Sequence, residues 1–179
     1  ALLGLLRFSG EALDNSGVKR WEAELERTVK TIQAAPPPSY WYSKGALAVS
    51  FENWKKAQRF FHHYIRSVKT EKTLDEREHD TMMARGLTMV ANALQQQGKL
   101  QRAKRITEIL LSRYEPLQLR GINGVLFLLI GLNFEKRNQI NSALEWYRRA
   151  HAAFLGEHNW YHHLYVLLAY ARISRLQRN

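Results

Sequence analysis

The stretch FLLIGLNFEKRNQINSALEWYRRA, residues 127–150, decides the fold class of this chain. It places Gly131 within an apolar run and Ala143 twelve residues later, with the turn-forming residues Arg137 and Asn138 between them. Two helices approach each other closely only where their side chains are small, so a small residue on each side of a short turn is typical of a helical hairpin. The stretch therefore predicts two packed antiparallel helices.

The same spacing recurs in two earlier windows. Each has a small residue, an Ala twelve residues later, a large apolar residue four positions before the first and another sixteen or nineteen positions after it. The small pairs are Gly45 with Ala57, Ala91 with Ala103, and Gly131 with Ala143; the large residues are Trp41 and Phe61, Leu87 and Leu110, and Phe127 and Tyr147. We expect the small residues where paired helices come closest and the large ones between pairs.

The flanking sequence also predicts helices. Residues 18–33 have amphipathic spacing and are followed by the helix-breaking residues 36–38, all proline. Thr73-Leu74-Asp75-Glu76 has the pattern of a capping box, and Glu115-Pro116 that of a helix start. A last helix is expected from about Trp160 to Arg175.

Together these signals predict an all-α fold of stacked antiparallel helix pairs, with about nine helices. We expect an N-terminal pair in residues 1–35, three pairs in residues 36–157 and a C-terminal capping helix in residues 158–179. All of them would belong to one domain, which we expect to be a fragment of a longer chain because the sequence begins with Ala1.

This pattern resembles the tetratricopeptide repeat. That family's order of aromatic, small residue, Ala and aromatic is reproduced by Trp41, Gly45, Ala57 and Phe61, and again by Phe127, Gly131, Ala143 and Tyr147. The middle window departs from it, since Ala91 replaces Gly and Thr107 replaces the second aromatic. The windows are also spaced more widely than in the family. The resemblance therefore implies a superhelix with longer helices or connections, as in the sensor domain of MalT-like bacterial transcription activators.

Composition excludes several classes of function. The chain has no Cys, which rules out disulfides, zinc–thiolate sites, iron–sulfur clusters and Cys nucleophiles, and which fits a cytoplasmic protein. Its apolar runs are too short to span a bilayer, so no membrane association is expected.

No pattern of catalytic residues is apparent. His158, His162 and His163 have a spacing that metal ligands can use, but no HExxH motif accompanies them, and packing beside aromatic residues is the more ordinary interpretation. The acidic residues Asp75, Glu76, Glu78 and Asp80 fall in the first turns of an expected helix, where they favour its positive end. Phosphate-binding loops and serine nucleophile motifs are absent. We expect no catalytic residue, cofactor or metal, and hence no enzyme.

A partner groove is expected on the concave face of the superhelix, which the first helix of each pair lines. Its predicted residues are Tyr42, Arg85, Thr88, Asn92, Gln95 and Leu128. Asn92 and Gln95 would bind the backbone of an extended peptide, and Arg85 would bind a carboxylate. The four groove residues of the middle window are equally typical of the solvated side of a long helix, namely Arg85, Thr88, Asn92 and Gln95.

Positive charge is concentrated in the second half of the chain. The net charge is +11, and residues 91–179 hold 13 Lys and Arg against 5 Asp and Glu. A basic patch is predicted on the second helices of pairs and the last helix, formed by Arg102, Lys104, Arg105, Arg148, Arg149, Arg172 and Arg175. Such a patch attracts nucleic acid, acidic lipid or an acidic protein.

The sequence thus predicts a non-enzymatic module that binds a peptide, another protein or an adjacent domain. A ligand-sensing domain of a MalT-like transcription activator is the first alternative, and a helical domain that contacts nucleic acid is the second. A second copy of the chain is a further candidate partner, because the last helix contains Leu164, Val166, Leu167 and Leu168.

Overall fold

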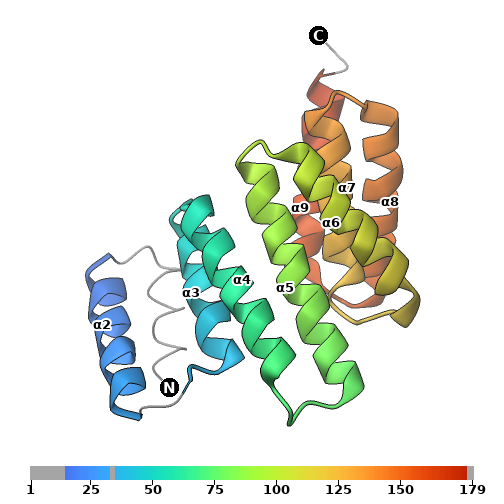
Figure 1. The fold of residues 1–179 in the computed structure, drawn as a ribbon. Helices are drawn as coiled ribbons and strands as arrows, with labels where there is room; N and C mark the ends of the chain where they lie inside the picture. The colour runs from blue at the N-terminus through green and yellow to red at the C-terminus, as the bar shows by residue number, and fades with distance from the viewer. Residues whose placement is uncertain (1–14, 33–34, 177–179) are drawn as a thin grey trace. The chain divides into compact units, whose positions relative to one another are not determined.

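The computed structural model describes residues 15–32 and 35–176, which form helices and connecting turns without any strand (Figure 1). The predicted all-α class is confirmed, and helices pack in pairs as expected. Against about nine expected helices, the described residues contain eight α-helices and one 3₁₀ helix: α2 (Asn15–Ile32), α3 (Pro38–Ser50), α4 (Trp54–Thr70), α5 (Glu76–Gln96), α6 (Leu100–Arg113), η1 (Glu115–Leu117), α7 (Asn123–Lys136), α8 (Ile140–Gly156) and α9 (Trp160–Leu176). The first part of the helix pair expected in residues 1–35 lies outside the described residues.

The chain forms two compact units, residues 1–97 and residues 98–179. The first contains α2 to α5 and the second contains α6 to α9. The expected middle pair places Ala91 in the first unit and Ala103 in the second. The packing of this middle pair therefore remains a prediction. The arrangement of residues 36–157 as three helix pairs within one domain also remains a prediction.

In the first unit, α3 and α4 form a hairpin and α5 packs on α4 (Figure 1). A Cβ atom on Gly45 would lie 2.5 Å from Cε1 of Phe61, so this ring rests directly on the backbone of α3. Phe61 thus packs within its own pair, whereas the sequence placed it between pairs. A second close approach, between α5 and α4, uses Gly86, whose added Cβ would lie 2.7 Å from Cγ1 of Ile65.

In the second unit, α7 and α8 form the corresponding hairpin. A Cβ on Gly131 would lie 2.5 Å from Cδ1 of Tyr147, and one on Gly124 would lie 2.5 Å from Cε1 of Phe154. The two glycines are seven residues apart and so lie on the same face of α7. Both rings are completely buried. Aromatic rings seated on glycines therefore hold α7 and α8 together.

The turns that end α3, α7 and α8 share one conformation. Glu52, Asn138 and His158 have φ values of 53°, 58° and 53°, in the left-handed region. In each turn the following residue donates its N–H to the carbonyl five positions back, with N–O distances of 2.8, 2.9 and 2.9 Å for Asn53, Gln139 and Asn159. This is the Schellman arrangement that closes helix ends. The turn predicted at residues 137–138 is confirmed, and the turns at residues 52–53 and between α8 and α9 have the same form.

The α8–α9 hairpin differs from the others at its closest point. His163 donates its backbone N–H to the carbonyl four residues earlier, in the turn. Ala57 and Ala143 do the same in their hairpins. Twelve residues earlier, where those hairpins have glycine, this one has His151. The rings of His151 and His163 are hydrogen-bonded, with 2.7 Å between Nδ1 and Nε2. Two histidines thus occupy the small-residue positions, and α9 still packs on α8 through buried Val166, Ala169 and Ile173.

Three local predictions are corrected by the structure. The capping box uses Asp75 and Glu78 in place of Thr73 and Glu76, because Asp75 accepts from the Glu78 N–H and the Glu78 side chain bonds back to Asp75. Glu115-Pro116 opens only the three-residue η1, because Gln118 adopts a left-handed conformation; α7 begins later, at Asn123. His158 lies in a turn, so it is not on the last helix with His162. The predicted extent of that helix is confirmed.

Candidate docking surfaces

Two residues of the predicted groove lie together in the first unit. The guanidinium carbon of Arg85 on α5 lies 6.0 Å from the ring centre of Tyr42 on α3, and the rings of Tyr42 and Tyr64 are 5.4 Å apart. Burial raises the pKa of Tyr64 to about 12, although the nearby Arg85 charge opposes the rise. Arg85 is exposed. This arrangement gives the unit a cation above an aromatic surface.

The other predicted groove residues are less accessible. Thr88 is buried and its hydroxyl donates to the Ala84 carbonyl at 2.8 Å, while Gln95 is completely buried. Asn92 is half-buried, and its side-chain oxygen accepts from Gln96 at 3.5 Å. Leu128 is buried in α7, which belongs to the second unit. The structure therefore brings Tyr42 and Arg85 together, and the complete groove remains a prediction.

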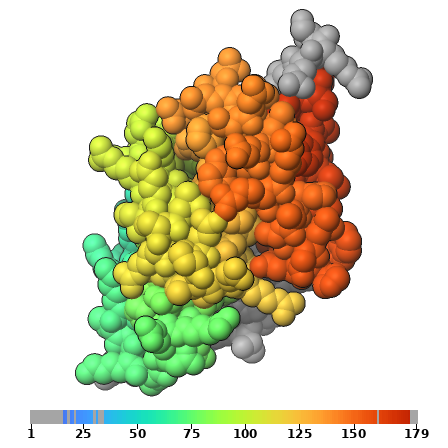
Figure 2. All heavy atoms as spheres, turned by 90° about the vertical axis from the view of Figure 1, so that its right-hand side faces the viewer, coloured from blue at the N-terminus to red at the C-terminus, as the bar shows by residue number. Residues whose placement is uncertain are grey.

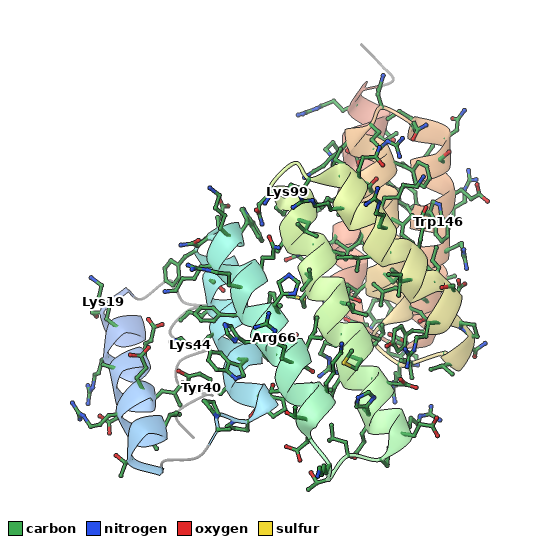
Figure 3. The ribbon with its side chains drawn as sticks, viewed as in Figure 1. Lys19, Tyr40, Lys44, Arg66, Lys99 and Trp146 are labelled. Atoms are coloured by element: carbon green, nitrogen blue, oxygen red, sulfur yellow. The ribbon has the colours of Figure 1, made fainter. Side chains whose placement is uncertain are left out.

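Several cations of the predicted basic patch are held by carboxylates. Arg149 forms a salt bridge with Glu115, and its guanidinium carbon lies 4.2 Å from the ring centre of Phe127 and 4.4 Å from that of Trp146, which is labelled in Figure 3. Lys104 is 3.6 Å from Glu108. Four further residues predicted for the patch are exposed, namely Arg102, Arg105, Arg148 and Arg175. Carboxylates of the same chain thus neutralise part of the positive charge predicted for the patch.

Arg172, also from this patch, belongs to a polar cluster that links three helices. Glu135 on α7 accepts two hydrogen bonds from Arg172 on α9, at 2.5 and 2.7 Å, and one from the Tyr147 hydroxyl on α8, at 2.5 Å. Burial acts to raise the pKa of Glu135, but the bonds from Arg172 and Tyr147 outweigh it, so this pKa lies below its ordinary value. The cluster fixes α9 against the α7–α8 hairpin.

The first unit contains a buried lysine that the sequence patterns did not identify. Lys44 on α3 lies 2.7 Å from Glu26 and 3.2 Å from Glu22, both on α2, and its ammonium is 5.3 Å from the Phe60 ring centre (Figure 3). Burial acts to lower the pKa of Lys44, but hydrogen bonding to Glu26, the nearby Tyr40 and Glu22 raise it above its ordinary value. Lys44 therefore ties α2 to α3.

His162 and His163 pack beside aromatic rings, as expected. His162 stacks on Phe154, with 5.6 Å between ring centres, and its Nδ1 lies 3.0 Å from the side-chain oxygen of Asn159. Burial lowers the pKa of His162. Across residues 15–32 and 35–176 there is no group of three or more His, Asp or Glu side chains arranged to hold a metal ion.

Among the residues that the structure describes, α9 carries more exposed large apolar side chains than any other helix. Trp160, Leu164, Leu167 and Leu168 are 65%, 54%, 46% and 53% exposed, although α9 packs on α8 through a different face. In Figure 2 α9 is the orange-red segment next to α8. The sequence had marked these leucines without separating the two faces. No pattern in the sequence of α9 separates the two faces, because the helix is apolar around most of its circumference.

No protein-family model, curated protein or solved structure matches this chain. None of the described helices combines the length and apolar character that a membrane crossing requires.

Proposed function

We propose that this chain is a non-enzymatic, tetratricopeptide-like interaction module that binds another protein in the cytoplasm. The observation that carries the proposal is the exposed apolar face of α9. Burying one leucine side chain contributes about 1.5–3 kcal/mol, so leaving several exposed on a single helix is costly unless a partner covers them.

The repeated helix contacts support the tetratricopeptide-like type. Gly45 with Phe61 and Gly131 with Tyr147 make the same glycine-on-ring contact in two separate hairpins. The absence of cysteine in the sequence supports a cytoplasmic setting.

A protein partner is favoured over nucleic acid by the chemistry of α9. Leucine and tryptophan side chains bury well against apolar surface, whereas a nucleic-acid backbone requires cations. Within the described part of the chain, Arg149, Arg172 and Lys104 already face carboxylates.

The test is affinity capture from cells with the wild-type chain, the double variant Leu164→Ser/Leu168→Ser and the control Ile109→Ser. Ile109 is an exposed apolar residue on α6, so the control removes the same kind of surface elsewhere. We expect one set of proteins to be retained at moderate salt by wild type and control and lost by the double variant. Equal retention by all three chains contradicts the proposal.

Nucleic acid is distinguished in the same experiment. If the captured material is DNA or RNA, and its retention falls by orders of magnitude between about 50 and 200 mM salt irrespective of α9, the chain is a nucleic-acid-binding domain.

A further inference from the structure

We infer that the exposed face of α9 binds an amphipathic helix of the partner, with an apolar stripe bordered by Asp and Glu. This inference rests on the proposed function and specifies the chemistry of the partner.

The face is continuous along the helix. Trp160, Leu164, Leu167, Leu168 and Ala171 follow one another at intervals of four, three, one and three residues, and all are exposed. Residues at these intervals lie on one side of an α-helix. Val166, Ala169 and Ile173, which pack on α8, lie on the other side and are buried. Thus α9 carries two apolar stripes, of which only one is covered by the described residues.

The shape and size of this face suit a single helix. A 17-residue helix is about 25 Å long, and its row of apolar side chains can pack against the i, i+3, i+4 and i+7 residues of another helix. A stable interface between two globular subunits involves roughly 20–30 residues on each side. The five residues of the α9 stripe are too few for that, and they match the footprint of a short helical segment.

The charge around the face selects an acidic partner. The sequence of α9 contains no Asp or Glu, and it carries Arg172 and Arg175 in its last turns. Arg175 is exposed and has no acidic partner in the described part of the chain. Arg172 is already bonded to Glu135, whereas Arg148 on α8 is exposed and lies close enough to Tyr170 of α9 to affect its pKa, which makes it a second cation near the helix. Cations at the border of an apolar stripe favour a helix with Asp and Glu at the matching border.

A second copy of the chain is a poorer occupant for the same reason. It would bring another α9 without acidic residues, from a protein of net charge +11. Like charges across an interface oppose association.

In the test, the full chain is immobilised and a displayed library of helical peptides, each about 18 residues or five turns long, is selected for binding to it. Leucine is fixed along one stripe, and the bordering positions are drawn equally from Asp, Glu, Lys, Arg and Gln. We expect Asp and Glu to be enriched roughly tenfold over Lys and Arg at the border. Enrichment should disappear on Leu164→Ser/Leu168→Ser, persist on Ile109→Ser, and lose most of its acidic bias on Arg175→Glu.

The inference is overturned by enrichment of Lys or Arg, by no enrichment, or by the same enrichment on the double variant. It is also overturned if sedimentation shows a micromolar dimer that Leu164→Ser/Leu168→Ser dissociates, since a second copy then covers α9. If the library gives no acidic helices but cellular capture still depends on Leu164 and Leu168, only this inference fails. If capture is indifferent to these leucines, the proposed function fails.

Discussion

At the scale of single residues, the backbone at Gly131 is in direct contact with the ring of Tyr147. In an exposed helix, Gly→Ala usually stabilises by about 0.5–1 kcal/mol, because alanine has less backbone freedom to lose. Here the new methyl group would overlap the Tyr147 ring. We therefore expect Gly131→Ala to destabilise the second unit by about 1–3 kcal/mol, measured by denaturant unfolding.

Gly156→Ala is the matched control for this prediction. Gly156 ends α8, and an added Cβ would meet no atom within 4 Å. This variant should be neutral or slightly stabilising. Equal effects of the two substitutions would contradict the close contact between α7 and α8.

Glu135 makes the stability of the second unit depend on pH. Since its pKa is lowered in the folded state, the stabilisation it provides is complete above the ordinary value of 4.5 and is lost as pH falls through the lower folded value. Arg172 is partly exposed, so solvent screening limits the effect. Glu135→Gln should cost about 1–2 kcal/mol at neutral pH. The difference from wild type should shrink towards zero in strong acid, as followed by urea unfolding at each pH.

The residues differ in how far the sequence could predict them. Gly45 and Gly131 were found because close helix approach requires a small residue at a fixed spacing. Gly86 was missed because it lies outside those windows. Lys44 and Glu135 were missed because charged residues usually face solvent. Each bonds to a residue on another helix, 18 positions away for Lys44 and Glu26 and 37 positions away for Glu135 and Arg172.

At the scale of elements, the α8–α9 hairpin contains the hydrogen bond between the rings of His151 and His163. Such a bond requires one ring to donate and the other to accept. We expect His163→Phe, whose ring can do neither, to loosen α9 selectively, because His151 then loses its partner. Hydrogen exchange, corrected for intrinsic rates, should show greater loss of protection in α9 than in α7.

The control for this prediction is His163→Gln, since a side-chain amide can still form a hydrogen bond with His151. Its α9 should keep most of its protection. Equal loss of protection in the two variants would show that the bond between the rings does not hold the hairpin.

Helix existence was predicted better than helix boundaries. The extent of α9 was correct because its apolar residues continue to its end. The start of α7 was placed too early because proline at a first turn fits a 3₁₀ helix as well as an α-helix. The cap of α5 was misplaced because Thr73 and Asp75 are both good capping residues, and only the reciprocal bond with Glu78 decides between them.

At the scale of the molecule, residues 98–179 form a compact unit with a buried core, which includes Leu126, Tyr147, Phe154 and Ile173. We expect this segment to fold when expressed alone, although its stability should be modest because small domains bury a smaller share of their surface. Circular dichroism should show a helical spectrum and a cooperative thermal transition. A helical signal that fades gradually on heating would mean that the unit requires the remainder of the chain.

The fold class could be predicted because one spacing recurs along the chain, whereas the surface could not. The predicted groove assumed that residues off the packing positions face solvent, but Thr88 and Gln95 are buried. Exposure of the α9 stripe depends on which face α8 covers, and the sequence of α9 alone is apolar on both.

The repeated turn at His158 has a consequence for how the number of helices in such a protein can change. Because α8 ends in the same turn as α3 and α7, it is the second member of one hairpin and the first member of the next. The chain is therefore not restricted to even numbers of helices. Gaining or losing a single terminal helix, with its turn, would keep the local geometry intact, so relatives of unequal helix number could arise by small insertions rather than by duplication of whole repeats.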